Sequence, residues 1–165
     1  ACIHYGPKAL ETPDDYEARA NLMWCASWAI NGFLDMGKPV AWSVHAIEHE
    51  LSAFYDITHG VGLAILTPNW MRYVLNDQTE HRFAAYGVNV WGLDPQLPQR
   101  ELAEAAIDKT RAFFNSLGLP ATLREVGIDA EKLPLMAKKA RTANFDRTFV
   151  SLSEEDILNI LKMSL

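Results

Sequence analysis

Three histidines in one short stretch of the chain are the residues best suited to chemistry: His45, His49 and His59. No Pro or Gly interrupts residues 42–54, and apolar residues recur there at helical spacing, which predicts a helix. Side chains four positions apart project from the same helix face, so the imidazoles of His45 and His49 should point the same way. Neutral imidazole nitrogens bind zinc and ferrous iron. The spacing therefore indicates metal chemistry.

A hairpin is expected to bring the third histidine back to the first two. A polar turn at 56–58 should end the first helix, and the apolar run 61–71 predicts a second helix with His59 at its N-terminal edge. No Cys lies nearby, and the zinc-protease order His-Glu-x-x-His is not met. Glu48 and Glu50 are open as ligands, as partners of ligands, or as solvated residues. The residues alone also leave open that the histidines are simply packed side chains.

Residues 45–73, HAIEHELSAFYDITHGVGLAILTPNWMRY, resemble the histidine signature of the iron-containing (group III) alcohol dehydrogenases. The sequence of this stretch is most similar to the butanol dehydrogenase branch of that family, which uses NADH or NADPH. The resemblance implies that His45 and His59 are metal ligands. It implies that His49 is a catalytic residue beside the substrate and nicotinamide, and not a regular ligand. Residues 10–37 and 152–161 are also similar, so the resemblance covers essentially the whole chain.

The resemblance implies that residues 1–165 are the C-terminal metal-binding and catalytic helical domain of a two-domain alcohol dehydrogenase. The N-terminal nucleotide-binding domain is expected to be absent, since no GxGxxG string and no alternating strand–helix pattern occurs. This chain is therefore expected to hold no cofactor-binding residues. The other two metal ligands of the family, an Asp and a His, would fall before residue 1. We expect a fragment that is inactive alone and takes NAD(P)H only through the absent domain.

The implied chemistry is reduction of short aliphatic aldehydes, or oxidation of the alcohols, at a divalent metal that acts as a Lewis acid. Two imidazoles suit Fe²⁺ and Zn²⁺ equally. The implied partners are a small alcohol or aldehyde, the chain's own N-terminal domain and, in the full-length enzyme, a second copy in a homodimer. Two alternatives stay open: a non-catalytic helical interaction module, and a glycerol-dehydrogenase-like or dehydroquinate-synthase-like enzyme. The aromatic residues Trp42, Phe54 and Tyr55 either wall the substrate pocket or belong to the core.

Composition excludes other classes of function. A formal net charge of −6 argues against a nucleic-acid surface, which needs a basic stripe. No apolar run approaches the length of a membrane span. The two cysteines, Cys2 and Cys25, form neither a disulfide framework nor a clustered metal motif, so a cytoplasmic location is expected.

The rest of the chain predicts an all-α, bundle-like domain, and the resemblance implies that it is similar to the helical domain of dehydroquinate synthase. No segment alternates as a strand would. Thr12 and Pro13 are expected to start a helix that runs toward Gly37 and is buried on most sides. Ser153 is expected to cap the last helix. Further helices are predicted over residues 79–90, 100–117 and 133–142, and His81 is expected to be exposed.

Overall fold

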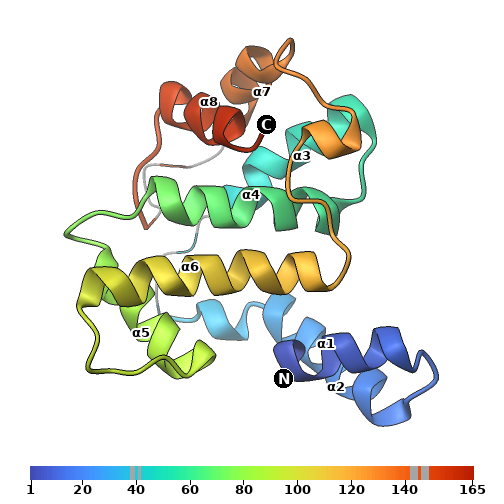
Figure 1. Cartoon of the computed structure of the whole chain (residues 1–165). Helices are drawn as coiled ribbons and strands as arrows, with labels where there is room; N and C mark the ends of the chain where they lie inside the picture. The colour runs from blue at the N-terminus through green and yellow to red at the C-terminus, as the bar shows by residue number, and fades with distance from the viewer. Residues whose placement is uncertain (38–39, 41, 142–144, 146–148) are drawn as a thin grey trace. The chain divides into compact units, whose positions relative to one another are not determined.

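The computed structural model describes residues 1–37, 40, 42–141, 145 and 149–165 (Figure 1). The described residues form α-helices and short 3-10 helices and no strand, which confirms the all-α prediction. Within these ranges, none of the helices has both the length and the apolar character that a membrane span requires. The chain divides into two compact units, residues 1–40 and 41–165, and each is described by itself.

The first unit is a helical hairpin followed by one short turn. It contains α1 (Cys2–Glu11), α2 (Tyr16–Ile30) and the 3-10 helix η1 (Phe33–Asp35). The Tyr5 hydroxyl donates to Glu17 across the hairpin at 3.0 Å. Asp15 caps α2, since its carboxylate accepts from the Ala18 N–H at 2.8 Å. The predicted start at Thr12 is therefore wrong, because Thr12 ends α1 and the turn after it places Asp15 at the cap.

The prediction that this helix is buried on most sides is also wrong for α2. Ala18 is its one fully buried residue, whereas Met23, Trp24 and Ile30 are 72%, 64% and 76% exposed. Apolar residues lie all round α2, and packing against α1 and η1 within the unit covers few of them. A scarcity of charge therefore did not predict burial here.

The second unit is organised around α4, which packs against α3, α6 and α8 (Figure 1). Helix α5 pairs with α6, and α7 packs against α3 and α8. The helices are α3 (Ser43–Tyr55), α4 (His59–Tyr73), α5 (Glu80–Trp91), α6 (Gln99–Ser116), α7 (Leu133–Ala140) and α8 (Glu154–Met163), with the 3-10 helix η2 (Arg124–Val126) before α7. The predicted helices agree with these within a few residues. Residue 142, the predicted end of one helix, lies outside the described residues.

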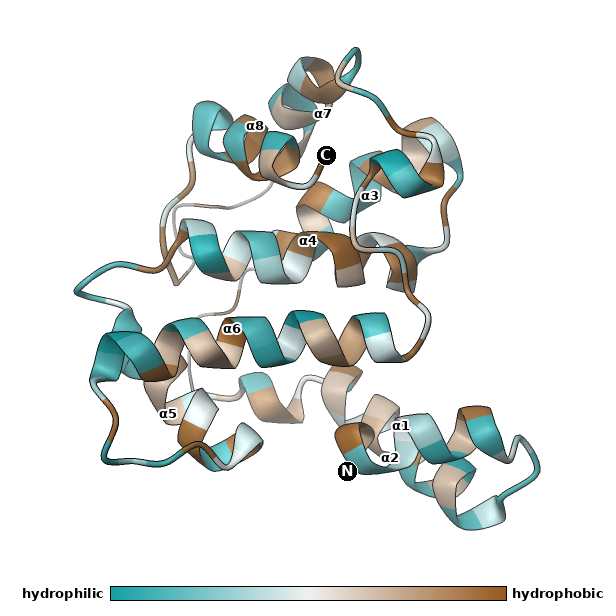
Figure 2. Cartoon of the chain, viewed as in Figure 1, coloured by the Kyte–Doolittle hydropathy of each residue, from teal (hydrophilic) through white to brown (hydrophobic). Residues whose placement is uncertain are grey.

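Helices α3 to α8 all contribute buried residues to one apolar core, and Val126 of η2 packs against it. Fully buried members include Leu51 of α3, Ile65 of α4, Ile107 of α6, Met136 of α7 and Ile160 of α8. Figure 2 shows alternating hydrophilic and hydrophobic bands along α6, as expected for a helix with one buried face. The core thus fixes the position of α4 by packing, and the first residue of α4 is the candidate site residue His59.

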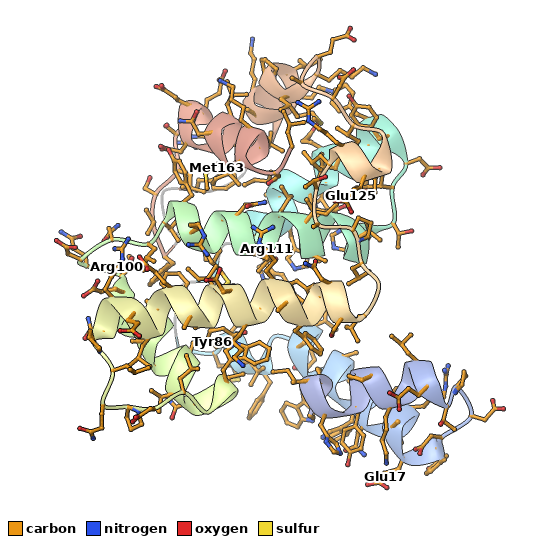
Figure 3. All side chains as sticks on the ribbon, viewed as in Figure 1. Glu17, Tyr86, Arg100, Arg111, Glu125 and Met163 are labelled. Atoms are coloured by element: carbon orange, nitrogen blue, oxygen red, sulfur yellow. The ribbon has the colours of Figure 1, made fainter. Side chains whose placement is uncertain are left out.

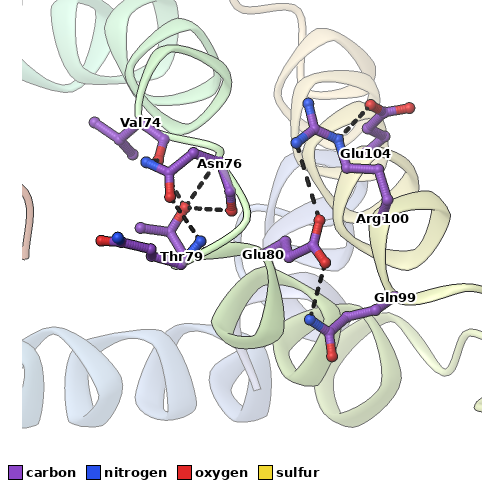
Figure 4. A network of polar contacts seen from close by, with 8 residues as sticks. Val74, Asn76, Thr79, Glu80, Gln99, Arg100 and Glu104 are labelled. Carbon is purple, nitrogen blue, oxygen red and sulfur yellow. Dashed lines mark hydrogen bonds and ion pairs between the residues drawn. The ribbon is translucent and has the colours of Figure 1, made fainter.

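Helices α5 and α6 approach closely because α5 has a glycine where they meet. A Cβ at Gly87 would lie 3.0 Å from the backbone oxygen of Leu102 and 3.2 Å from the Ala106 Cβ. Polar contacts at the start of the pair support it. Figure 4 shows Glu80 with Gln99 and Arg100 on one side and the Thr79 turn with Asn76 and Val74 on the other.

Further polar contacts join α6 to α4 and α5. Arg111, which Figure 3 shows between α6 and α4, donates to the buried Asn69 of α4 at 2.6 Å. Tyr86 of α5 bonds the Thr110 hydroxyl of α6 at 3.1 Å. The buried side chains of Asn69 and Thr110 are thus paired across the helix contacts, as a stable interior favours.

The last helix begins as predicted. The Ser153 hydroxyl accepts from the Asp156 N–H, and the Asp156 carboxylate accepts from the Ser153 N–H, which is a capping box. Tyr73 at the end of α4 donates to the same carboxylate at 2.5 Å. This group of contacts ties the C-terminal end of α4 to the first turn of α8.

Candidate metal centre

The predicted hairpin between the two histidine helices is present. Helix α3 ends at Tyr55, and Asp56 adopts the left-handed conformation with φ 52°, which Asp tolerates better than most residues. Thr58 then takes an extended conformation, and α4 begins at His59. The short turn returns the chain on itself, so the first residue of α4 lies beside α3.

All three histidines come together at this end of the hairpin. Their ligand nitrogens lie within 4.8 Å of one another. The ring centroids of His45 and His59 are 5.0 Å apart, and those of His49 and His59 are 5.3 Å apart. The closest approach joins His45 Nδ1 to His59 Nε2 at 3.0 Å. A separation of this size is near that of two nitrogens sharing one ion, with each nitrogen at about 2.1 Å from it.

The cluster is open on one side and buried on the other. The His59 side chain is 44% exposed, His49 is exposed and His45 is half-buried. Partial burial lowers the pKa of His45, and the neighbouring imidazoles of His59 and His49 lower it further. Both effects favour the neutral imidazole, which is the form that binds a metal.

Behind the cluster lies a carboxylate that solvent does not reach. Glu48 of α3 is 0% exposed, and one of its oxygens accepts a hydrogen bond from His59 Nδ1. Its other oxygen accepts from the Ser52 hydroxyl at 2.7 Å, one turn further along α3. Sequence reasoning left the role of Glu48 open. The structure makes it the partner of a candidate ligand, on the side of the imidazole away from the cluster.

The aromatic residues near the site divide into two groups. The Trp42 ring meets the His45 ring edge to face, with centroids 4.6 Å apart, so Trp42 borders the cluster. Phe54 and Tyr55 pack against the core, and the Lys132 ammonium lies over both rings. These two aromatics thus contribute to the packing beside α7. His81 is exposed on α5, as predicted, and is not part of the histidine cluster.

Comparisons with known proteins identify the family to which this fold belongs. Residues 2–165 match the C-terminal model of the Fe-containing alcohol dehydrogenase family. The chain therefore belongs to that family and corresponds to its C-terminal part.

Curated relatives and solved structures support the same assignment. The chain is 60% identical to NADH-dependent butanol dehydrogenase A of Clostridium acetobutylicum, over 99% of this chain and 42% of that protein. It is 38% identical to the NADPH-dependent aldehyde reductase YqhD of Escherichia coli, over 83% of this chain and 35% of that protein. The NADH-dependent butanol dehydrogenase A structure from Thermotoga maritima superposes with a TM-score of 0.85 at 33% identity, over 98% of this chain and 42% of that one. The chain thus spans less than half the length of these relatives.

Sequence reasoning missed how the buried side of the site is built. Glu48 and Ser52 repeat at the same four-residue spacing as His45 and His49, on the neighbouring strip of α3. The spacing of Glu48 and Ser52 was a signal that could have been recognised in the sequence. Gly62, three residues after His59, was another, since a glycine inside a helix often marks a close approach.

Proposed function

We propose that this chain supplies the metal-binding side of an NAD(P)H-linked alcohol dehydrogenase or aldehyde reductase that acts on short aliphatic substrates of the butanol and butanal type. Membership of the Fe-containing alcohol dehydrogenase family supports this proposal. The observation that carries it is the convergence of His45, His49 and His59 at an accessible edge of the hairpin. Under this proposal residues 1–165 form one catalytic domain of a longer two-domain enzyme.

The residues present fit a divalent metal. His45 and His59 would hold it, and further ligands would come from outside this chain, since such sites use three or more protein ligands. The Fe²⁺ or Zn²⁺ ion would supply Lewis-acid polarisation of the alcohol or aldehyde oxygen. His49 lies one helical turn from His45 and is exposed. In this proposal a ring nitrogen of His49 orients the substrate oxygen or moves its proton.

The other partners follow from the same assignment. The names of the relatives include both NADH and NADPH dependence. The dinucleotide is proposed to bind to residues outside this chain, and the full-length enzyme is proposed to be a homodimer. Cys2 and Cys25 are free thiols, which fits a reducing cytoplasmic location.

Metal content of histidine variants tests the proposal. In the full-length protein, His59→Ala and His45→Ala should each lose nearly all bound metal and turnover, because each removes a ligand that no neighbour replaces. His81→Ala is the matched control, since its imidazole is exposed on α5 outside the cluster. Elemental analysis after dialysis measures the outcome. A full equivalent of metal in His59→Ala together with normal turnover would refute the assignment.

A further inference from the structure

We infer that Glu48 is a positioning residue, which holds His59 so that the Nε2 atom of its imidazole faces the metal. This inference rests on the proposed function, because it concerns how one proposed ligand is presented. It assigns a role to Glu48, Ser52 and Gly62, none of which is itself placed in the ligand set.

The first step is the direction of the hydrogen bonds around His59. A carboxylate oxygen can only accept, so the Glu48 bond fixes the proton of His59 on Nδ1. A neutral imidazole then has its lone pair on Nε2. That atom is the one that points into the cluster, 3.0 Å from His45 Nδ1. Glu48 thus selects the tautomer and the ring orientation that metal binding requires.

The second step is that folding stability does not explain a carboxylate at this position. Glu48 is completely buried, and its two recorded partners in the described part of the chain are His59 and Ser52. Removing a carboxylate from water is costly, and a buried ion pair is weak evidence for stability. An apolar residue of similar volume would fill the same space without that cost. The polar group therefore serves the histidine that it contacts.

The third step is that two neighbours keep the Glu48 side chain in place. The Ser52 hydroxyl donates to the Glu48 oxygen that does not contact His59. Gly62 of α4 leaves space for the Glu48 side chain, because a Cβ at position 62 would lie 2.6 Å from both Glu48 Cγ and Glu48 Oε1. Any other residue at 62 would displace the carboxylate from His59. The glycine is thus required by Glu48, and the arrangement spans both helices of the hairpin.

Zinc affinity of Glu48 variants tests the inference directly. Full-length protein is stripped of metal and titrated with Zn²⁺ in competition with a chromophoric chelator. Glu48→Ala should bind Zn²⁺ about 10- to 100-fold more weakly, the range typical for loss of a residue that supports a ligand. Glu48→Gln should lie between Glu48→Ala and the parent, because its amide oxygen still accepts from Nδ1–H. Glu50→Gln, the same change two residues along α3, should leave the affinity unchanged.

A spectroscopic readout separates positioning from a merely structural role. In the metal-free parent protein, ¹⁵N chemical shifts of the His59 ring should report a proton on Nδ1. In Glu48→Ala the two tautomers should both be populated, while circular dichroism shows the same helix content. An unchanged Nδ1–H signal in Glu48→Ala would overturn the inference.

A double-mutant cycle tests the role of Gly62. Gly62→Ala alone should weaken Zn²⁺ binding by a factor similar to that of Glu48→Ala, because the added Cβ displaces the carboxylate. The double variant Glu48→Ala, Gly62→Ala should bind no more weakly than Glu48→Ala, since there is no longer a side chain to displace. A double variant that loses the product of the two factors would overturn the link between Gly62 and Glu48.

The outcomes distinguish this inference from the proposed function. If His59→Ala loses its metal and Glu48→Ala binds Zn²⁺ within twofold of the parent, Glu48 is not a positioning residue and the metal site stands. If His59→Ala keeps its metal, the site itself is wrong and the role of Glu48 falls with it.

Discussion

At each end of α4 a side chain donates a hydrogen bond to a carboxylate of a neighbouring helix, and the two carboxylates have different surroundings. At the N-terminal end, His59 donates to Glu48 of α3. At the C-terminal end, Tyr73 donates to Asp156 of α8. Both contacts join α4 to a neighbouring helix through a ring that bears a polar hydrogen. Because the two contacts are chemically similar, a difference in their roles must come from the other groups around each carboxylate.

The difference lies in what else each carboxylate and its partner touch. Asp156 also accepts from the backbone N–H and the hydroxyl of Ser153, so it completes a helix cap. Glu48 is buried, and among the residues that the structure describes no backbone N–H donates to its carboxylate. Its partner His59 turns a second nitrogen toward an exposed cluster. A carboxylate held by the backbone at a helix end stabilises the fold. A buried carboxylate that supports an exposed imidazole costs folding free energy, and its role in the metal site accounts for its presence.

The largest effect is expected from Glu48→Met at the N-terminal end of α4. The thioether matches the carboxylate in length, and a buried charge is replaced by an apolar group. The Ser52 hydroxyl can still reach the Ile57 carbonyl at 3.2 Å, and the His59 side chain is 44% exposed, so its ring can turn the N–H to solvent. We expect Zn²⁺ affinity to fall at least tenfold, about 1.4 kcal/mol. The free energy of unfolding of the metal-free protein should stay the same or rise by about 1 kcal/mol.

Urea unfolding with a chelator present, combined with a Zn²⁺ titration, measures both quantities. A loss of more than about 2 kcal/mol of stability, with the affinity unchanged, would make Glu48 a structural residue like Asp156.

Asp156→Asn should give the opposite result at the other end of α4. The amide keeps the shape of the side chain but removes the charge that favours the N-terminus of α8 and strengthens the bonds from Tyr73 and Ser153. We expect the free energy of unfolding at pH 7 to fall by about 1 kcal/mol, with Zn²⁺ affinity unchanged. Glu155→Gln is the control, since Glu155 lies in the same first turn outside the capping box. An equal loss in both variants would assign the effect to helix charge alone.

The two ends of α4 were not equally predictable from the sequence. The capping box needs only a hydroxyl and an acid three residues apart before an apolar run, so Ser153 was identified correctly. The histidine hairpin was also predicted, because its spacing and turn are local. The contact between Glu48 and His59 depends on how closely α4 approaches α3, which Gly62 determines across 14 residues of sequence. Local sequence patterns do not reveal how closely the two helices approach each other.

In the first unit too, contacts between helices decided features that the sequence did not predict. No helix was predicted before Thr12, although α1 forms there with Pro7 inside it. The start of α2 was placed at Thr12, whereas the contacts of α1 with α2 leave Asp15 as the cap. Burial of α2 was inferred from its small number of charged residues, which leaves it mostly apolar. Apolar content measures what a helix can bury, and its packing partners decide how much it does bury.

The smallest expected effect is on the pH dependence of stability, and it comes from Tyr73 and Asp156 together. Burial alone would raise the pKa of Asp156, but the hydrogen bonds from Tyr73 and Ser153 outweigh it and the pKa is lowered. Burial, followed by the bond to Asp156, raises the pKa of Tyr73. A lowered carboxyl pKa stabilises the fold above the unfolded value of about 3.9, and this contribution is lost as pH falls through the folded value. A raised phenol pKa stabilises the fold below the unfolded value of about 10, and this contribution is lost as pH rises through the folded value.

Tyr73→Phe should therefore flatten both limbs of the stability curve, the acid one below about pH 4 and the alkaline one above about pH 10. It should also lower stability at pH 7 by about 1 kcal/mol, since it removes one hydrogen bond to a charged acceptor. Tyr16→Phe is the matched control, because Tyr16 is 86% exposed at the start of α2. Urea unfolding from pH 3 to pH 11 measures the curves. If Tyr73→Phe and the parent fall in parallel at both extremes, the Tyr73–Asp156 bond does not set the pH range over which the C-terminal end of α4 holds α8.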